Sequence, residues 1–209
     1  MSTQAAGRVK RVLDLVLCTA TLPLSVPLLS LAAVLVKLGG PGPVLYRARR
    51  VGRGGVEFDM FKFRTMTPDC DGLRVTSSGD SRVTRVGAWL RASKLDELPQ
   101  IFNVIRGEMS LVGPRPEDPL YVASYTPEQR LVLSVRPGMA NSAFLRFGHE
   151  QKYLERVAPD DLDRFYRAEL LPQTLDLELR YVRGWSLAGD LRILVRTVAG
   201  LLPGRWWSP

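Results

Sequence analysis

Two acids and an arginine in one short stretch of the chain have the types and spacing of a site for phosphorylated ligands. The stretch reads LDELPQIFNVIRGEMSLVGPRPE, with Asp96 next to Glu97 and with Arg115 between two prolines. Adjacent carboxylates can share a divalent cation, and an arginine whose neighbours fix φ can grip phosphate oxygens with little ordering cost. Arg91 and Lys94 stand just before the acids. The combination predicts a site for a diphosphate.

The same acids have a second interpretation at the start of a helix. Apolar residues recur with a mostly helical period up to Gly107, and Pro99 interrupts it, so we expect a new helix to begin near Ser93 or Asp96. This places the two acids near the positive end of the helix dipole, where phosphate binds readily. Ser93 and Asp96 also match the S/T-x-x-D/E capping pattern. From these residues alone, capping and ligand binding both stay open.

A further pair of cations is expected on a β-strand. Residues 58–66, FDMFKFRTM, alternate so that Phe61 and Phe63 face one way while Lys62 and Arg64 face the other. Two cations two residues apart can grip one phosphate, although such a pair is more often the solvated side of a sheet. The arginines of the Gly- and Pro-rich stretch before this strand have two similar interpretations, phosphate binding or contact with anionic lipid headgroups.

The composition favours a polyanionic partner and excludes several kinds of catalysis. The 209 residues hold 29 Lys and Arg against 21 Asp and Glu, a formal charge of +8. Nucleic acid, anionic lipid headgroups or a phosphorylated substrate would each match this charge. Cys18 and Cys70 lie in unlike contexts and predict neither a disulfide framework nor a CxxC site. His149 is the single histidine, so a multi-His metal site is excluded, and a Ser-His-Asp or Cys-His mechanism would depend on this one imidazole. Carboxylates and cations are therefore the expected chemical groups.

The N-terminal part of the chain predicts a membrane segment. Residues 12–36, VLDLVLCTATLPLSVPLLSLAAVLV, carry one charge, Asp14, and cationic residues flank both ends. Pro23 and Pro27 should break the helix near its middle, where nearby Thr and Ser hydroxyls can satisfy freed carbonyls. We therefore favour a re-entrant helix-break-helix that enters and leaves the bilayer on one side. A kinked helix that crosses the bilayer is the alternative, whereas a signal peptide fits poorly because the apolar run is long.

An amphipathic helix is expected near the C-terminus. Its apolar stripe consists of Leu191, Leu194, Val195, Val198 and Leu202. Arginines border the stripe, and Trp206 and Trp207 follow it. Such a helix suits the membrane interface, and packing on the protein core is the alternative.

Several motifs carry a resemblance to a known family over nearly the whole chain. They are KRVLDLVL with its proline-broken apolar run, GGPGPVLYRARRVGRGGVEFDMFKFRTM, RVTRVGAWLRASKLDELPQIFNVIRGEMSLVGPRPE, VRPG and YVRGWSLAGDLRILVRTV. In these motifs the chain resembles the bacterial monotopic polyprenyl-phosphate phosphoglycosyl transferases, which begin exopolysaccharide, O-antigen or glycoprotein glycan assembly. The long and dense motif from DELPQ to GPRP makes the match specific.

The resemblance implies a mixed α/β, mostly helical fold in three parts. A basic flank, 1–11, precedes a re-entrant membrane helix, 12–37, and a catalytic domain with interfacial amphipathic helices follows, 38–209. This domain would lie on the cytoplasmic face of the bacterial inner membrane, in contact with membrane lipids. We expect no nucleic acid partner, and a homo-oligomer is left open.

The resemblance also implies covalent catalysis on a UDP-sugar. The acid matching Asp96 would attack the sugar-linked phosphate, release UMP and carry the phosphosugar until polyprenyl phosphate accepts it. Mg²⁺, held by Asp96 and Glu97, would offset the charge of the diphosphate. The residues expected to bind phosphate are Arg91 and Arg115, which match family positions, together with Lys62 and Arg64.

Two departures from the family pattern limit what the resemblance implies. The Ser-Pro pair of the family's membrane break is Val26-Pro27 here, with Ser25 one residue earlier. After the VRPG motif the chain reads MANSAFLRFGHEQKYL, residues 139–154, where many relatives continue with Thr-Gly and a glutamine. The sugar is therefore not implied. Arg146 and Glu150 are candidates for contacts with the nucleotide or the sugar, with ordinary surface contacts as the alternative.

Two other functions remain as alternatives. A membrane-anchored basic domain without catalysis would explain the positive charge and the apolar segment, but it gives no reason for the LDELPQ motif or for the Pro-Arg-Pro sequence. A lipid diphosphate phosphatase would use the same aspartate with water as the acceptor.

Overall fold

The computed structural model describes residues 3–67, 80–147, 157–158 and 161–201. Helices dominate this part of the chain and its strands form two small pairs, so the expected mostly helical α/β class is confirmed. The helices are α1 (Thr3–Leu38), α2 (Arg85–Ala92), α3 (Gln100–Arg106), α4 (Pro119–Val122), α5 (Ser142–Phe147), α7 (Leu162–Phe165), α8 (Leu171–Arg183) and α9 (Leu187–Leu201). The strands are β1 (Leu45–Val51), β2 (Glu57–Phe63), β3 (Ser110–Val112) and β4 (Gly138–Ala140). Among the residues discussed above, Cys70, His149, Glu150, Leu202, Trp206 and Trp207 lie outside the described residues.

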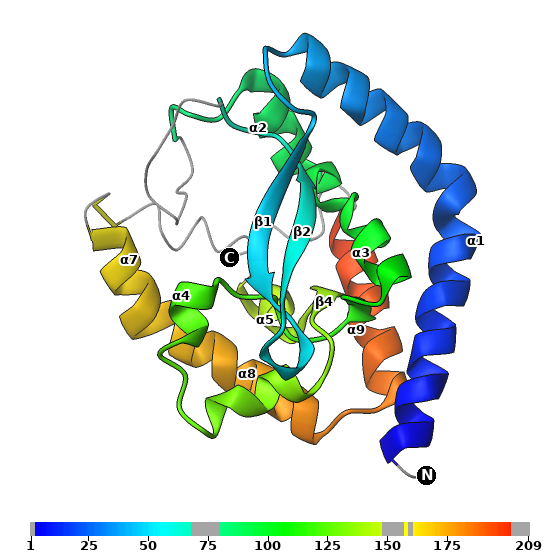
Figure 1. Ribbon diagram of the computed structural model, residues 1–209, viewed down its shortest axis with the longest axis vertical. Helices are drawn as coiled ribbons and strands as arrows, with labels where there is room; N and C mark the ends of the chain where they lie inside the picture. The colour runs from blue at the N-terminus through cyan, green and yellow to red at the C-terminus, as the bar shows by residue number, and fades with distance from the viewer. Residues whose placement is uncertain (1–2, 68–79, 148–156, 159–160, 202–209) are drawn as a thin grey trace.

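Strands β1 and β2 form an antiparallel hairpin in the middle of the molecule (Figure 1), with Leu45 opposite Phe63. Gly54 turns the chain between them with a φ of 72°, a conformation that favours glycine. Phe61 and Phe63 are buried, and Lys62 between them is half-buried. The strand predicted over residues 58–66 is therefore confirmed in its main part.

Strands β3 and β4 pair in parallel and bring the two glycine-proline motifs together, with Ser110 opposite Gly138. The backbone N–H of Gly138 donates to the carbonyl of Pro114 at 2.8 Å. A Cβ at Gly138 would lie 2.0 Å from the backbone nitrogen of Gly113, so this contact requires a glycine. The VRPG motif therefore fixes the backbone that leads into Arg115.

Helix α1 continues through both of its prolines. Pro23 and Pro27 lie inside the helix, and its ribbon curves without a gap (Figure 1). The hydroxyl of Thr21 donates to two carbonyl oxygens of the preceding turn at 2.9 and 3.1 Å, and that of Ser25 donates to the carbonyl of Thr21 at 2.6 Å. The expected interruption into two helices is not seen, because a gradual curve accommodates the missing backbone donors.

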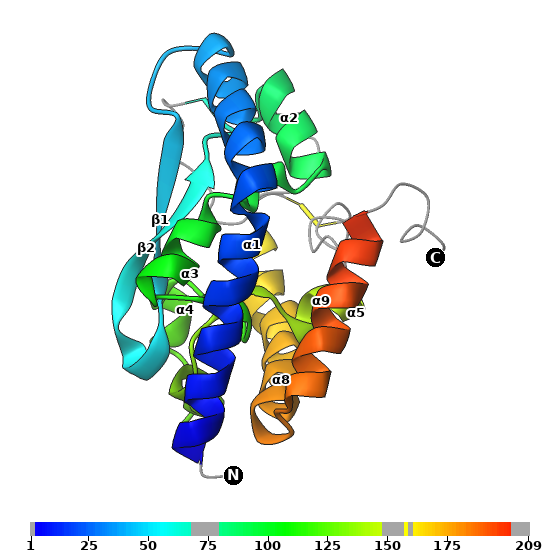
Figure 2. The same cartoon turned by 90° about the vertical axis from the view of Figure 1, so that its right-hand side faces the viewer.

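One face of α1 packs on the rest of the molecule along its length. Asp14 and Cys18 are buried in its first half, and Ala32 and Val36 are buried near its end. In Figure 2, α1 crosses the front of the molecule, with α9 beside its first half and α2 beside its end. The opposite face is apolar and exposed, and includes Val12, Leu13, Val16, Leu17, Leu24, Val26, Leu31 and Val34. In the described chain, Gly7–Leu38 is the one helical stretch long and apolar enough to cross a membrane.

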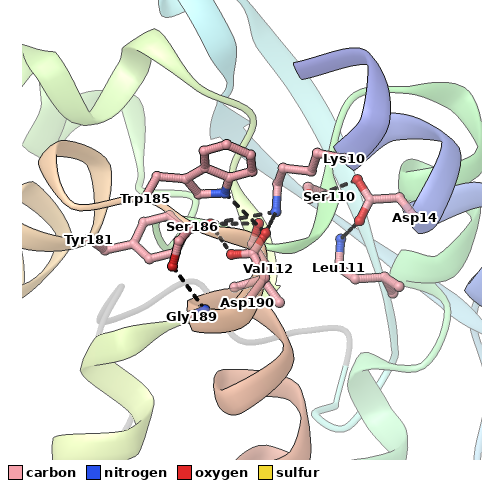
Figure 3. Close-up of polar contacts among 10 residues, drawn as sticks. All are labelled: Lys10, Asp14, Ser110, Leu111, Val112, Tyr181, Trp185, Ser186, Gly189 and Asp190. Atoms are coloured by element: carbon pink, nitrogen blue, oxygen red, sulfur yellow. Dashed lines mark hydrogen bonds and ion pairs between the residues drawn. The ribbon is translucent and has the colours of Figure 1, made fainter. Parts of the chain in front are cut away.

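A polar junction fastens the first turns of α1 to the far end of the chain (Figure 3). We use this name for Lys10, Asp14, Ser110, Tyr181, Trp185 and Asp190. Asp190 accepts hydrogen bonds from Lys10 Nζ at 2.5 Å and from the Tyr181 hydroxyl at 2.7 Å. The indole N–H of Trp185 donates to the same carboxylate at 3.0 Å. Asp14 accepts from the Ser110 hydroxyl at 2.8 Å, so α1 is joined to both α9 and β3.

Helix α9 leaves part of its apolar stripe uncovered. Leu191, Val195 and Val198 are exposed, whereas Ile193 is buried against residues of β3 and β4. The alternative in which the whole stripe packs on the core is therefore wrong for these three exposed residues.

Candidate active site

The two adjacent acids lie in a short 3-10 turn, Leu95–Glu97, between α2 and α3. Lys94 precedes this turn in the left-handed conformation, with φ 58°, and among the described residues no other non-glycine has a positive φ. The helix α3 begins only at Gln100, with Pro99 as its N-cap, so the expectation that the acids occupy the first turn of an α-helix is corrected. A non-glycine residue held in this conformation is typical of functional sites.

The capping interpretation of Ser93 is wrong. Its hydroxyl donates to the carbonyl oxygens of Trp89 at 2.9 Å and Leu90 at 3.1 Å, within the last turn of α2. The hydroxyl therefore satisfies carbonyl oxygens at the C-terminal end of α2 and does not cap a following helix, so capping does not explain Asp96.

Asp96 is buried without a full set of partners. The residue is 8 % exposed, and in the described part of the chain its Oδ1 has no hydrogen-bond partner. Burial, followed by the negative charge of Glu97, raises the pKa of Asp96 to about 6, against the opposing charges of Lys62, Lys94 and Arg91. Buried polar atoms are almost always paired, so an orphaned carboxyl oxygen indicates a place for a ligand or a reacting atom.

Glu97 has the opposite electrostatic state. Its Oε1 accepts from Lys62 Nζ at 2.9 Å. Burial alone would raise the pKa of Glu97, but the charges of Lys62 and Lys94 and the hydrogen bond from Lys62 hold it below its ordinary value. Two neighbouring carboxyls whose pKa values are pushed apart can divide the roles of a reactive group and a permanently charged support.

Cations from three segments surround this pair of acids. Arg91, on α2, donates through Nε to the Thr65 hydroxyl at 2.8 Å, and its charge acts on both Asp96 and Glu97. Lys62 comes from β2, and the charge of Arg115 also acts on Glu97. The structure therefore brings together five of the residues predicted to bind or react, although they are widely spaced in the sequence.

Arg64 and Arg146 are placed differently. The guanidinium of Arg64 donates to the carbonyl oxygens of Val36 at 3.1 Å, Gly40 at 2.8 Å and Pro41. It therefore stabilises the chain as it leaves α1, and the structure does not bring it to the carboxylates. Arg146 is exposed in the last turn of α5.

Helix α5, which carries Arg146, nevertheless borders the site. Lys94 Nζ lies 5.1 Å from the centre of the Phe144 ring, a cation–π contact. The departure from the family pattern that begins at residue 139 is thus in contact with the turn that holds the acids.

The Arg115 segment rests on a residue that the sequence interpretation missed. Glu178, on α8, is 2 % exposed, and its carboxyl accepts a hydrogen bond from the backbone N–H of Arg115. A sequence signal existed, because Glu178 shares a face with Leu171, Leu175 and Leu179 at helical spacing. Thr65 and the backbone conformation of Lys94 were missed as well, and they carry no comparable pattern.

The acids fit a magnesium ion that shares its ligands with a substrate. No group of three or more His, Cys, Asp or Glu side chains in the described ranges could hold a metal by itself. Mg²⁺ is commonly held by one or two carboxylates together with substrate phosphates. The Oδ1 of Asp96, unpaired within the part of the chain that the structure describes, lies beside the ionised Glu97 and matches that donor set.

Comparison with known proteins gives a match over most of the chain. The model of the bacterial sugar transferase family matches residues 5–204. The chain is 43 % identical over 201 residues to a UDP-glucose:undecaprenyl-phosphate glucose-1-phosphate transferase of Caulobacter vibrioides, covering 92 % of this chain and 69 % of that protein.

Two further relatives differ in their named activity and in length. A UDP-N-acetylgalactosamine-undecaprenyl-phosphate N-acetylgalactosaminephosphotransferase of Aeromonas hydrophila is 36 % identical over 201 residues, covering 94 % of this chain and 44 % of that protein. An exopolysaccharide production protein of Rhizobium meliloti is 36 % identical over 218 residues, covering 95 % of this chain and 88 % of that protein. The chain therefore spans most of two of these relatives and less than half of the third.

Proposed function

Because this chain belongs to the bacterial sugar transferase family, we propose that it transfers a sugar 1-phosphate from a UDP-sugar to undecaprenyl phosphate or a similar polyprenyl phosphate. The products are UMP and a polyprenyl diphosphate sugar, and the step begins the assembly of an exopolysaccharide or a related glycan. The named activities of the relatives support the donor and acceptor classes, and their named sugars differ, so the sugar is left unassigned.

The observation that carries this proposal is the buried Oδ1 of Asp96, which has no partner among the described residues and lies beside an ionised acid and several cations. We propose that a carboxylate oxygen of Asp96 attacks the sugar-linked phosphorus of the donor. The bond from that phosphorus to the bridging oxygen breaks, and its electron pair leaves with UMP. An oxygen of the polyprenyl phosphate then attacks the same phosphorus and releases Asp96.

The surrounding groups support this displacement by position and charge. Arg91 and Arg115 offer guanidinium groups to phosphate oxygens, with Arg91 held in place by Thr65. Lys62 keeps Glu97 ionised, and Glu97 with Asp96 would hold a magnesium ion. When bound, that ion supplies positive charge that lowers the repulsion between the carboxylate and the diphosphate.

A re-entrant placement of α1 at the cytoplasmic face of the inner membrane is part of the proposal. Both ends of α1 contact the same domain through buried residues, Asp14 in its first half and Val36 near its end. A helix attached to one domain at both ends fits an element that enters and leaves on one side of a bilayer. Its exposed apolar face and the exposed stripe of α9 are the surfaces expected to contact lipid.

The activity is tested with purified full-length protein, Mg²⁺ and a panel of UDP-sugars, by measuring UMP release with and without polyprenyl phosphate. One donor should give lipid-linked phosphosugar and an equal amount of UMP. A protein that releases no UMP with any donor would fit a non-catalytic binding domain. A protein that instead yields phosphate from lipid diphosphate alone would fit a phosphatase.

The placement of α1 is tested by cysteine labelling in intact cells. Gly7→Cys and Leu38→Cys are made one at a time in a background with Cys18→Ala and Cys70→Ser, since position 7 is open and Leu38 is exposed. Both single-cysteine proteins should resist a membrane-impermeant maleimide added outside. Labelling of position 7 alone would show that the helix crosses the bilayer.

A further inference from the structure

Glu178 is a buried acid outside the set of residues assigned to the reaction. It lies on α8, on the same face as Leu171, Thr174, Leu175 and Leu179, and all five are buried. A lone carboxyl on such an apolar face is costly to bury, so its hydrogen bonds have to be explained one by one.

Its hydrogen bonds lead to the two segments that border the active site. The backbone N–H of Ala143, in the first turn of α5, donates to Oε1 at 3.4 Å, and the neighbouring Ser142 hydroxyl donates to the carbonyl of Leu177 on α8 at 3.4 Å. The backbone N–H of Arg115 donates to it as well. In the described part of the chain, Oε2 has no partner.

The hydrogen bond from Arg115 has no substitute within its own segment. Pro114 and Pro116 lack a backbone N–H, so Arg115 supplies the one amide donor between Gly113 and Glu117. The N–H of Gly113 is already used, since it donates to the carbonyl of Ala140 at 3.1 Å. Glu178 is therefore the acceptor that fixes the one free-standing amide of the Pro-Arg-Pro segment.

The protonation of Glu178 suits this role. Burial raises the pKa of Glu178 to about 8, against the opposing hydrogen bonds from Ala143 and Arg115 and the charge of Arg115. A carboxyl that keeps its proton at neutral pH accepts the N–H groups without adding a negative charge. A neutral Glu178 does not compete with an anionic ligand for the guanidinium of Arg115.

We infer that Glu178 is a positioning residue, which holds the Arg115 backbone and the first turn of α5 in one fixed arrangement at the edge of the carboxylate site. The inference rests on the proposed function in one respect, the assignment of Arg115 to substrate phosphate. Glu178 also binds the first turn of α5 next to Phe144, and the Phe144 ring contacts Lys94 beside the acids. Glu178 thus connects the Arg115 turn to the segment in which this chain departs from its relatives.

Hydrogen exchange on the full-length protein tests the contact without any need for turnover. A peptide that covers residues 112–118 reports few amides because two of its residues are prolines. Glu178→Leu removes the acceptor and should speed exchange at Arg115 by about tenfold or more. Glu178→Gln keeps an acceptor oxygen and should leave this exchange slow. Thr174→Val, a buried polar residue one turn earlier on the same face, is the matched control and should also leave it slow.

An Arg115 amide that exchanges equally slowly in Glu178→Leu and in the wild type would overturn the inference. If Glu178→Leu does not fold, Glu178→Asp replaces it. The aspartate side chain is one methylene shorter, so its carboxyl lies farther from the Arg115 amide, and exchange of that amide should again be faster than in the wild type. The exchange measurement needs no donor sugar. If the wild-type protein releases no UMP, the proposed function is rejected, but the exchange rates still show whether Glu178 binds the Arg115 backbone.

A double-mutant cycle tests the consequence for the reaction. Glu178→Leu should lower kcat/KM for the donor by about 10- to 100-fold, as expected for a misplaced binding group, with Glu178→Gln close to the wild type. In an Arg115→Ala background, Glu178→Leu should cause little further loss, because the group it positions is gone. Losses that multiply in the double variant would overturn the positioning role and indicate a general effect on folding.

Discussion

Two regions of the molecule bury carboxyl groups to nearly the same depth but partner them differently. In the polar junction, Asp14 and Asp190 are 6 % and 7 % exposed, and both carboxylates accept several hydrogen bonds (Figure 3). In the turn Leu95–Glu97, Asp96 is 8 % exposed, and its Oδ1 has no partner in the described structure. Burial alone therefore does not separate the acid proposed to react from the acids that hold the fold. Asp96 differs from Asp14 and Asp190 because one of its oxygens has no partner among the described residues, a feature that it shares with Glu178.

The difference also separates two duties of the same residue type. The polar junction uses its carboxylates to fix α1 on the domain, and Arg11 extends this attachment by donating to the carbonyl of Ile105 at 3.0 Å, near the end of α3. The acidic turn lies just before the start of the same helix. A saturated carboxylate holds structure in place, whereas an unsaturated one keeps its affinity for a ligand.

The largest expected effect comes from Asp96→Asn. Because this change removes the carboxylate that we propose as the nucleophile, UMP release should fall by more than about 10³-fold, as for other covalent nucleophiles. The melting temperature should stay equal or rise, since a buried charge with an unpaired oxygen is removed. Activity assays and thermal melts on the same preparation check both. Asp176→Asn, an exposed carboxyl on α8, is the control and should change neither. Retained turnover in Asp96→Asn would move the nucleophile elsewhere.

Asp190→Ala should show the reverse pattern. It removes the acceptor of Lys10, Tyr181 and Trp185 and leaves the ammonium group of Lys10 largely buried without its partner. Breaking a buried ion pair in this way costs roughly 3 kcal/mol of stability. Thermal or denaturant unfolding measures the loss, while turnover of the folded fraction should stay close to the wild type. An unchanged melting temperature would mean that the junction does not hold α1.

Glu178 is intermediate, because one of its oxygens accepts a hydrogen bond and the other has no partner within the described ranges. Its pKa is raised to about 8, so the folded state favours the neutral form. Its contribution to stability is therefore best at low pH and declines as pH rises from the ordinary value of a glutamate towards 8. The groups that face it are Arg115, Tyr125 and Tyr181.

The difference in unfolding free energy between Glu178→Gln and the wild type tests whether the contribution of Glu178 to stability declines as pH rises. Relative to the wild type, the glutamine variant should gain up to about 1.4 kcal/mol per pH unit between about pH 5 and pH 8. Denaturant titrations at three pH values measure the trend. A difference that stays flat with pH would show that Glu178 is ionised throughout.

Local signals predicted the parts of this molecule that depend on near neighbours. The apolar run of α1, the strand around Lys62 and the adjacent acids were all visible, because each rests on residues a few positions apart. The expected break at Pro23 and Pro27 was not seen, since α1 is supported along one face by the domain and can curve instead.

Long-range contacts set the limit of the sequence interpretation. Lys62 and Arg64 lie two residues apart and looked equivalent, yet one pairs with Glu97 and the other binds carbonyls at the end of α1. The bond from Ser110 to Asp14 joins residues 96 positions apart. No local spacing contains that information, because it depends on which helix packs on which strand. The grouping of Asp96 and Glu97 with Lys62 and Arg91 could be predicted, and its role in catalysis stays a prediction, but the attachment of Arg115 to Glu178 could not be predicted.

The smallest expected effect is that of Lys62→Gln, and it sharpens the comparison from within the site. Lys62 and Glu97 are 23 % and 28 % exposed, so solvent screens their pair and its loss should change stability by less than about 1 kcal/mol. Without the ammonium group, the pKa of Glu97 rises towards that of Asp96, and the two acids compete for one proton. We expect kcat/KM for the donor to fall by about tenfold, equal to about 1.4 kcal/mol, because Glu97 is less fully ionised while the proposed nucleophile Asp96 remains.

Arg49→Gln, which removes an exposed pair with Glu57 on the same hairpin, is the control and should leave kcat/KM unchanged. A loss in Lys62→Gln as large as that in Asp96→Asn would mean that Lys62 acts on the reacting phosphate itself, and the division between a reactive acid and its support would then have to be drawn again.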